Sequence, residues 1–486
     1  MYTEHVATIC LVFWRSSKEI TLLSVYIWLA VGLVLVVFVG LFLHRVRTLK
    51  APLLYAYGLY EFARSIQILS GQLRKEGLID KEDVHKQYPT WSGEPFLNRH
   101  IHLTKLSTPS SRAVTAPNND TLYTSAILDL STGPVELIVP DATERYLSVA
   151  FMDMFNDQIA YIGTRATKGK GGVYWLVGPG QQASPSEGVQ RIDFPVNDLW
   201  MLARVFVSGT SDLDAARELQ RQIRVCPLDP SNKGVPFQTK ATSARDPKNV
   251  LAVINELLAR SPQTGHSQRA TQWSAFGIQP GNVNAFDTLP LLTRLAWSLL
   301  TAHVERLIVK RIDAQQSAQA GWMTPPPILG QYGTQDDIRA AVSLIGFGAL
   351  TVDEAMYFRA MTDHQGRPLD GQQTYRMRIP AEGVPVDAFW SLSMYKPDET
   401  KRLYFYENEI DRYAINSASQ DLTYQENGDI LLAIQPHRPD DPTLVWLPTP
   451  AGAFQMIFRT YLPKQEIISG QWQVPEVKML PHTTNA

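Results

Sequence analysis

The sequence predicts a mainly β protein with some helix: two β-sandwich or jelly-roll-like domains joined by a helical segment and preceded by one transmembrane helix. Three observations lead to this fold class. Two blocks of short aromatic and β-branched runs are divided by Gly and Pro, as strands and turns are. The middle third repeats apolar residues with the helical period. One unbroken apolar run lies near the start of the chain.

The composition is that of a globular protein with a substantial core. Hydrophobic residues make up 44% of the 486 residues and charged residues 19%, which excludes a disordered chain. The formal net charge of -2 excludes nucleic acid as a partner, because proteins that bind it present a basic face. With only two cysteines, Cys10 and Cys226, the chain has neither a disulfide framework nor a thiolate zinc site.

The apolar run at residues 22–43 contains no charge and is long enough to cross a bilayer as a helix. A cleaved signal peptide is the alternative, but its apolar part is usually about 7–15 residues followed by small residues. Here basic residues follow at 44–47, so we expect a single-pass anchor. Lys and Arg number two before the run and three after it, and the amino terminus evens the balance, so the charges do not decide orientation.

We divide the chain into an N-terminal segment with the anchor (1–48), a first β domain (49–209), a helical connecting segment (210–362) and a second β domain (363–486). The expected helices are 51–74, 211–225, 247–260, 288–312 and 334–350. The expected strands are 125–130, 135–139, 145–152, 172–177 and 199–207 in the first domain and 375–379, 388–395, 430–435, 443–447 and 454–462 in the second.

The two β blocks carry similar landmarks in the same order. In the first, a strand ends at Val139-Pro140 and a later one begins an Arg-Val-Phe-Val run at Arg204. In the second, a strand ends at Ile379-Pro380 and a later one carries Arg-Thr-Tyr-Leu from Arg459. Two sandwiches of one topology would explain the match. Coincidence among aromatic strands is the alternative that the sequence leaves open.

The densest polar cluster is the run Asn-Asn-Asp-Thr at 118–121, just before a strand that starts at Tyr123. Such side chains bond to their own backbone, so the cluster is typical of an Asx-turn that fixes a hairpin, which is the interpretation we favour. The functional alternative places Asn118, Asn119 and Tyr123 around a ligand at the mouth of a β domain. In that case Asp120 is a catalytic acid or base.

Several arginines stand in or beside aromatic strands. A buried guanidinium needs a partner, and its planar donors suit a ligand that carries a carboxylate or phosphate. Structural ion pairs with Asp129, Asp153 or Asp411 are the alternative. The residues that we expect at a binding site besides the polar run are Arg145, Arg165, Asn408, Arg412, Tyr413, Trp446 and Arg459.

No motif of a standard reaction is present. The Gly-containing run at 178–183 is interrupted by Pro179 and is not followed by a helix, so it is no dinucleotide site. The sequence has no nucleophile elbow, zinc-protease motif or phosphate-binding loop. His100 and His102 would share one face of a strand, but without a third ligand nearby we predict no metal site, and no cofactor is assigned.

Two series of motifs carry a family resemblance. The first is Ala-Pro-Asn-Asn-Asp-Thr-Leu-Tyr at 116–123, then Leu128-Asp129-Leu130, Gly133-Pro134, Val139-Pro140-Asp141, Arg145-Tyr146, Gly163-Thr164-Arg165 and Gly178-Pro179. The second is Asp370-Gly371, Phe389-Trp390-Ser391-Leu392, Asn408, Arg412-Tyr413, Gly428-Asp429, Trp446-Leu447-Pro448, Arg459, Tyr461, Pro463, Trp472 and Pro475.

On these residues the chain resembles a tandem of two domain families of unknown function, DUF1254 followed by DUF1214. The resemblance implies two jelly-roll-type β domains joined by helices, in proteins that are exported or membrane-associated in bacteria. It therefore implies a body outside the cytoplasm, in the periplasm. It implies no reaction.

Two classes of function follow. The first is a membrane-anchored protein that binds a ligand or serves in assembly, with a cleft lined by aromatic and Arg side chains. The alternative is a hydrolase for a sugar- or lipid-like substrate, with Asp120 as acid or base. An enzyme needs two or more convergent titratable groups in one pocket, and a binding protein does not. The expected partners are the membrane and a small-molecule ligand, and a homo-oligomer is left open.

Overall fold

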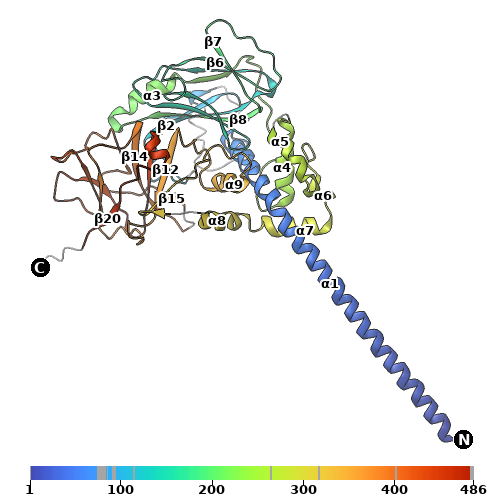
Figure 1. Cartoon of the computed structure of the whole chain (residues 1–486). Coiled ribbons are helices and arrows are strands. Elements are labelled where there is room, and N and C mark those ends of the chain that lie inside the picture. Colours follow the sequence, from blue (N-terminus) through green and yellow to red (C-terminus); the bar gives the residue numbers. More distant parts are fainter. Residues whose placement is uncertain are drawn as a thin grey trace.

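The computed structural model describes residues 2–73, 84, 86–89, 95–112, 115–262, 265–315, 318–399 and 402–481, with the backbone alone at 2–24, 266 and 311–315. Two β domains form most of the body, a helical layer flanks them, and a long helix extends away from this layer (Figure 1). The predicted fold class is confirmed.

The N-terminal helix α1 (Tyr2–Leu69) is continuous from the apolar run into the body. Its side chains at 25–43 are mostly exposed and apolar, whereas Tyr55, Tyr60 and Phe62 are fully buried in the main core. Among the described residues, it is the one helix long and apolar enough to cross a membrane. The expected span and the expected helix at 51–74 are therefore two parts of a single helix.

The first sandwich consists of two sheets with the orders β1-β2-β8-β4-β5 and β7-β6-β3-β9. All neighbours are antiparallel except β6 and β7, which are parallel. The strands are β1 (His100–Leu103), β2 (Thr121–Asp129), β3 (Val135–Val139), β4 (Leu147–Asp153), β5 (Gln158–Gly163), β6 (Gly172–Val177), β7 (Val189–Asp193), β8 (Asp198–Phe206) and β9 (Arg224–Pro227).

The second sandwich has one sheet with the order β10-β11-β12-β19-β14, to which β15 and β16 add on β14, and one with the order β18-β17-β13-β20. The strands are β10 (Ala318–Gln319), β11 (Trp322–Met323), β12 (Ala355–Ala360), β13 (Tyr375–Ile379), β14 (Val386–Pro397), β15 (Leu403–Tyr404), β16 (Ala414–Asn416), β17 (Ile430–Gln435), β18 (Val445–Pro448), β19 (Gln455–Pro463) and β20 (Val477–Met479).

The two sandwiches share one topology, as the shared landmarks predicted. Taken in chain order, the eight strands from β2 to β9 correspond one to one to β12, β13, β14, β16, β17, β18, β19 and β20. The parallel pair β6 and β7 thus corresponds to the parallel pair β17 and β18. The registers agree residue by residue. Arg204 of β8 lies between Tyr123 and Ser148, just as Arg459 of β19 lies between Tyr357 and Ser391.

The connecting segment is helical only in part. Its helices are α3 (Leu213–Arg221), α4 (Pro247–Arg260), α5 (Gly265–Arg269), η3 (Ala270–Phe276), α6 (Ala285–Thr288), α7 (Leu291–Thr301), α8 (Val304–Gln315) and α9 (Asp336–Ile345). However, β9 joins the first sandwich, and β10, β11 and β12 join the second, all inside the expected helical range of 210–362. Strands of two to four residues, as β9, β10 and β11 are, show too little period to be read from sequence, because the partner strand decides their pairing.

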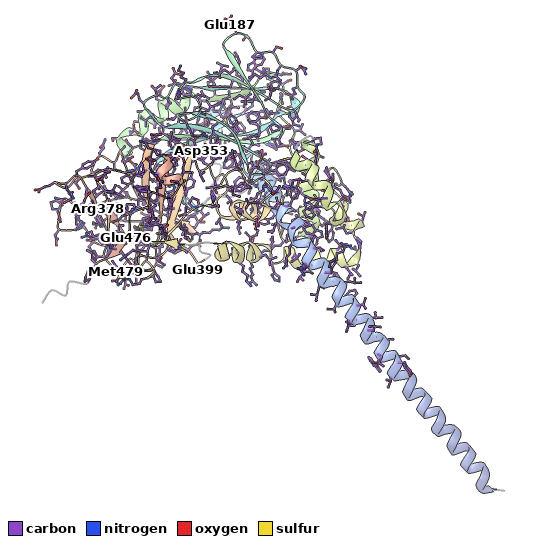
Figure 2. All side chains as sticks on the ribbon, viewed as in Figure 1. Glu187, Asp353, Arg378, Glu399, Glu476 and Met479 are labelled. Carbon is purple, nitrogen blue, oxygen red and sulfur yellow. The ribbon has the colours of Figure 1, made fainter. Side chains whose placement is uncertain are left out.

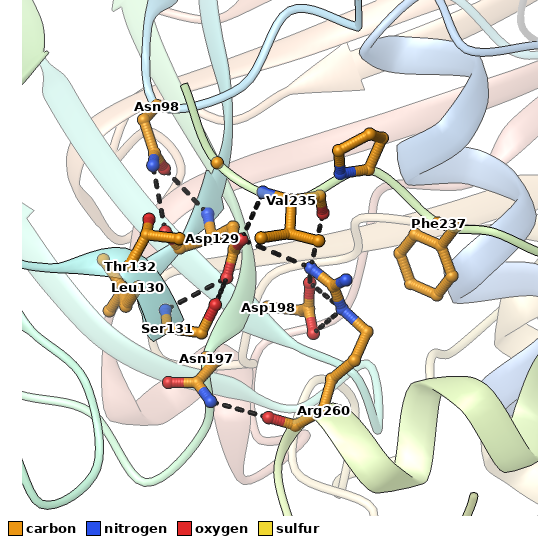
Figure 3. A network of polar contacts seen from close by, with 12 residues as sticks. Asn98, Asp129, Leu130, Ser131, Thr132, Asn197, Asp198, Val235, Phe237 and Arg260 are labelled. Atoms are coloured by element: carbon orange, nitrogen blue, oxygen red, sulfur yellow. Dashed lines mark hydrogen bonds and ion pairs between the residues drawn. The ribbon is translucent and has the colours of Figure 1, made fainter. Parts of the chain in front are cut away.

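A polar network fixes α4 to the end of the first sandwich (Figure 3). Asp129 and Asp198 are register partners at the ends of β2 and β8. Arg260, at the end of α4, donates through Nε to both carboxylate oxygens of Asp198 at 2.9 and 2.8 Å and lies 3.5 Å from Asp129. Asp129 also accepts the backbone N–H of Ser131 and of Val235. One arginine thus neutralises two buried carboxylates.

Candidate functional site

The two sandwiches meet in a contact that we call the domain seam, whose centre is an aromatic quartet. Phe389 stacks on Tyr461 with ring centroids 4.1 Å apart, and Phe206 and Tyr146 lie 4.0 and 5.6 Å from Phe389. In the first sandwich the N–H of Phe206 donates to the Tyr146 carbonyl, and in the second Tyr461 is the register partner of Phe389. Tyr146 therefore corresponds to Phe389, and Phe206 corresponds to Tyr461. Equivalent residues of the two sandwiches therefore face each other.

Two carboxylates reach across the seam. Asp120 precedes β2 and accepts hydrogen bonds from the Ser391 hydroxyl at 2.5 Å and from Nδ2 of Asn416 at 3.0 Å, both in the second sandwich. Glu354 precedes β12 and accepts from the Tyr146 hydroxyl at 2.9 Å and from Nε of Arg165 at 2.6 Å, both in the first. Figure 2 labels the neighbouring Asp353, which pairs with Arg165 at 2.7 Å.

The electrostatics of the seam follow from burial. Burial raises the pKa of Asp120, and the hydrogen bonds from Ser391 and Asn416, together with Arg459, act against this. Arg459 donates to the hydroxyls of Ser393 and Tyr395, both at 2.7 Å. Its equivalent Arg204 donates to the Gly348 carbonyl at 3.0 Å, while its Nη1 has no hydrogen-bond partner among the described residues.

The polar run at 118–121 therefore faces the seam. Asn118 accepts the N–H of Asp120 through Oδ1, which is the expected Asx-turn, and donates to the Tyr461 hydroxyl at 2.9 Å. Asn119 donates to the Ser107 carbonyl. Tyr123 is partly exposed, and its ring centroid lies 5.8 Å from the Arg204 guanidinium. The catalytic assignment of Asp120 stays a prediction, and its burial and bonding favour the structural interpretation.

The predicted arginines of the first sandwich have protein partners. Arg145 donates to the carboxylate of Asp212 and to the Phe206 carbonyl, all at 2.6 Å. Arg165 bonds to Asp353 and Glu354. Ion pairing is thus observed, but not with the aspartates that the sequence suggested, because Asp129 binds Arg260 and Asp153 accepts nearby backbone N–H groups.

Four of the predicted residues form a second cluster, which lies at the loop before β16 and at β18. They are Asn408, Arg412, Tyr413 and Trp446. The side-chain amide of Asn408 donates through Nδ2 to the Arg412 carbonyl at 2.9 Å and accepts the Arg412 N–H through Oδ1 at 3.0 Å. Arg412 donates to the Trp446 carbonyl at 2.7 Å and pairs with Asp421. Tyr413 donates to Asp411, and Trp446 is buried. Only Arg459 of the predicted residues in the second β domain lies at the seam.

A pocket of about 310 Å³ opens elsewhere in the second sandwich, beside β11, β12 and the turn after α10 (Gln465–Ile468). Its walls are mostly apolar, and its polar lining consists of Gln319, Thr324, Ser469 and Gln473. None of the residues that line it is an Asp, Glu, His, Cys, Lys or Arg. The remaining lining residues are Trp322, Pro325, Pro327, Val352, Met356, Phe358, Ile467, Ile468, Gly470, Trp472 and Val474.

The duplication explains why this space is open. By register, Trp322 of β11 corresponds to His100 of β1, since they pair with Ala360 and Ala126 of equivalent strands. In the first sandwich the corresponding helix α3 has nine residues, and its buried Gln220 donates to the carbonyls of Leu103 and Tyr123. The helix at this place in the second sandwich, α10, has four residues. The shorter helix leaves uncovered a face that α3 covers in the first sandwich.

The two histidines of the first sandwich lie in the covered region. The Val225 N–H donates to Nδ1 of His100 at 3.0 Å, and Nδ1 of His102 lies 2.9 Å from the Thr124 hydroxyl. Burial and the neighbouring His100 lower the pKa of His102 to about 3. Both rings are thus held inside the protein by their own contacts.

None of the residues predicted from sequence lines the pocket. Trp322 and Trp472, close to Pro and Gly, are the signal that could have indicated it, because Trp residues are enriched in binding surfaces. Whether a Trp faces a core or a pocket depends on the length of a distant helix, and sequence periodicity does not show this.

Residues 97–227 match the family model of DUF1254 and residues 354–465 that of DUF1214, each described as a protein of unknown function. The resemblance is thus confirmed in both halves and in that order. The chain is similar to the crystal structure of the VPA0106 protein from Vibrio parahaemolyticus, with 22% identity, a TM-score of 0.65, and coverage of 90% of this chain and 100% of that one. This likeness shows a shared fold.

A crystal structure of an uncharacterized protein from Burkholderia cenocepacia is also similar, with 12% identity, a TM-score of 0.43, and coverage of 91% of this chain and 96% of that one. The comparison with curated proteins gives no match.

Proposed function

We propose that this tandem-domain chain is a membrane-anchored binding protein that takes a small apolar or aromatic ligand into the pocket of its second sandwich. The observation that carries the proposal is a lining with two Trp rings and no titratable side chain. A hydrolase would need two convergent titratable groups there. The alternative that uses Asp120 has less support, because Asp120 is 1% exposed and bonded through both carboxylate oxygens.

The chemistry of the walls defines the class of ligand. Nε1 of Trp322 donates to the Pro475 carbonyl at 3.0 Å, so its polar atom is satisfied within the protein. Met356 and Phe358 add further apolar surface from β12. A volume of about 310 Å³ lies at the lower end of ligand pockets, which fits a single aromatic ring with a short substituent. The polar lining can bind one polar group of such a ligand.

Indole is a water-soluble probe for this pocket. The full chain in lipid nanodiscs would be titrated with indole and followed by saturation-transfer NMR. Thr324 is exposed and lines the pocket, so Thr324→Trp should fill the entrance and weaken binding about tenfold or more. Ser184→Trp, on an exposed loop of the first sandwich, is the matched control and should bind as wild type does. Equal binding by all three proteins would refute the assignment.

The same proposal includes the location. An exposed, charge-free stretch of α1 supports a single-pass anchor, and the exported character implied by the family resemblance supports a periplasmic body. Alkaline phosphatase fused to the C-terminus should be active, and green fluorescent protein fused there should be dark. The reverse result would place the body in the cytoplasm.

A further inference from the structure

The helix α7 has a second apolar face that points away from the core. Leu291, Leu295 and Leu299 are 58%, 42% and 44% exposed, and their spacing of four residues places them on one side of the helix. The opposite side is buried and includes Ala296 and Trp297. In the part of the chain that the structure describes, nothing covers the leucine side.

This face lies where α1 leaves the body. Phe42 and Val46 of α1 pack, partly buried, against the main core, so the exposed apolar stretch ends here. The Arg45 guanidinium lies 5.5 Å from the Phe276 ring centroid, and the Phe276 carbonyl accepts Nε1 of Trp297 on α7 at 2.9 Å. Figure 1 shows α7 at the exit of α1 and α8 at the same lower edge of the body.

Unpaired basic side chains accompany this edge. Arg47 and Lys50 on α1 and Arg306 and Lys310 on α8 are exposed, and none has an ion pair within the described residues. Among the described side chains nearby, the acidic Glu305 is paired with Arg245 and Asp287 with Lys248. The free charge of the described side chains at this edge is therefore positive, which is complementary to anionic lipid headgroups.

We propose that α7 lies in the interface of the same bilayer that α1 crosses, with its three exposed leucines at the boundary of headgroups and acyl chains. This inference rests on the proposed anchor. A helix with leucines on one face beside Lys and Arg is typical of an interfacial helix. The helix α7 packs against α1 close to the end of the exposed apolar stretch, and this position beside the proposed span favours the bilayer over a second copy of the chain.

Spin labels on the full chain test this in nanodiscs of phosphatidylcholine with phosphatidylglycerol. Single cysteines would be introduced as Leu295→Cys, Val31→Cys and Tyr424→Cys in a Cys10→Ser/Cys226→Ser background. Val31 reports on the span, and Tyr424 is an exposed apolar position in the second sandwich. Relaxation by oxygen, which concentrates in lipid, would be compared with relaxation by a water-soluble nickel chelate. All three sites are exposed, so the labels should leave the fold intact.

The expected ratio of oxygen to nickel accessibility is several-fold higher at Leu295 and Val31 than at Tyr424. A lipid-exposed Val31 with a water-exposed Leu295 would refute the position of α7 and leave the anchor intact. A water-exposed Val31 would refute the anchor itself. Dipolar broadening at Leu295, with loss of access to both reagents, would mean that a second copy covers the leucines, and would also overturn the proposal.

Discussion

Asp120 and Glu354 occupy the same position in the two sandwiches, and each carboxylate is bound by side chains of the other sandwich. The backbone carbonyl of Asp120 accepts the N–H of Val207, and the backbone carbonyl of Glu354 accepts the N–H of Leu462. Val207 and Leu462 are themselves equivalent, because they follow the last residues of β8 and β19 that pair with β2 and β12 in the same register. Among the described residues, the side chains that donate to each carboxylate all belong to the other sandwich. We expect the two sandwiches to unfold together, because separation would leave both carboxylates without these partners.

Replacing Asp120 with Ala should lower the free energy of unfolding by about 2–3 kcal/mol, because the buried donors on Ser391 and Asn416 lose their acceptor. Indole binding should remain unchanged, since Asp120 does not line the pocket. Denaturant unfolding and the indole titration together check this. The exposed Glu187→Ala is the control and should change neither. Loss of indole binding by folded Asp120→Ala would instead favour a ligand site at the seam.

Replacing Arg260 with Ala should cost about 3–5 kcal/mol of unfolding free energy, since two buried carboxylates lose their shared cation. Adding Asp198→Asn should recover part of that loss, because it removes one of the two stranded charges. Chemical denaturation of the two single variants and the double variant measures the coupling. Strictly additive losses would contradict the network in Figure 3.

Stability should depend on pH through Asp153. Burial and the neighbouring Asp157 raise the pKa of Asp153 to about 7, whereas the unfolded carboxyl titrates near its ordinary 3.8. Between these two pH values the carboxyl is ionised in the unfolded chain but still protonated in the folded protein, so a rising pH favours unfolding. The contribution of Asp153 to stability is therefore full below about pH 4 and is lost as the pH rises to about 7.

Asp153→Asn keeps an oxygen for the N–H groups of Phe155 and Asp157, and should flatten this pH dependence by about 2–4 kcal/mol between pH 4 and pH 7. Melting curves of wild type and variant across this range provide the measurement. Parallel pH profiles would show that Asp153 ionises in the fold as it does in the unfolded chain.

Gly371 should tolerate no side chain. A Cβ there would lie 1.7 Å from the Pro450 carbonyl oxygen, so Gly371→Ala must displace the backbone and should cost about 3 kcal/mol or more. At Gly209 a Cβ would meet nothing within 4 Å, and Gly209→Ala should change stability by no more than about 0.5 kcal/mol. Thermal melting of the two variants compares the positions directly.

Much of the fold follows from local pattern. The strands at 135–139, 375–379 and 430–435 and the helix at 247–260 have the predicted bounds, because each is a regular run between Pro, Gly or a capping Asp. The landmarks at Arg204 and Arg459 indicated one topology for both halves. Strands such as β5 and β9 were not predicted, since their neighbours in the sheet decide their pairing.

The candidate site was harder to predict because it depends on what lies opposite each residue. Asn118 and Asp120 are the polar turn that the sequence indicated, but their partners Tyr461 and Ser391 are hundreds of residues away. The pocket depends on the shortness of α10 beside Trp322, and the pattern around Trp322 does not record the length of that helix.

The continuity of α1 has a mechanical consequence. A flexible tether would let the body rotate independently of the apolar stretch, but here one helix runs from that stretch to Leu69, which packs partly buried against the main core. The helix continues through Pro52, and its C-terminal part is buried in the main core, so no loop separates the exposed stretch from the body. If α1 crosses a bilayer as proposed, a change in its tilt, for example in a bilayer of different thickness, would therefore turn the body as well.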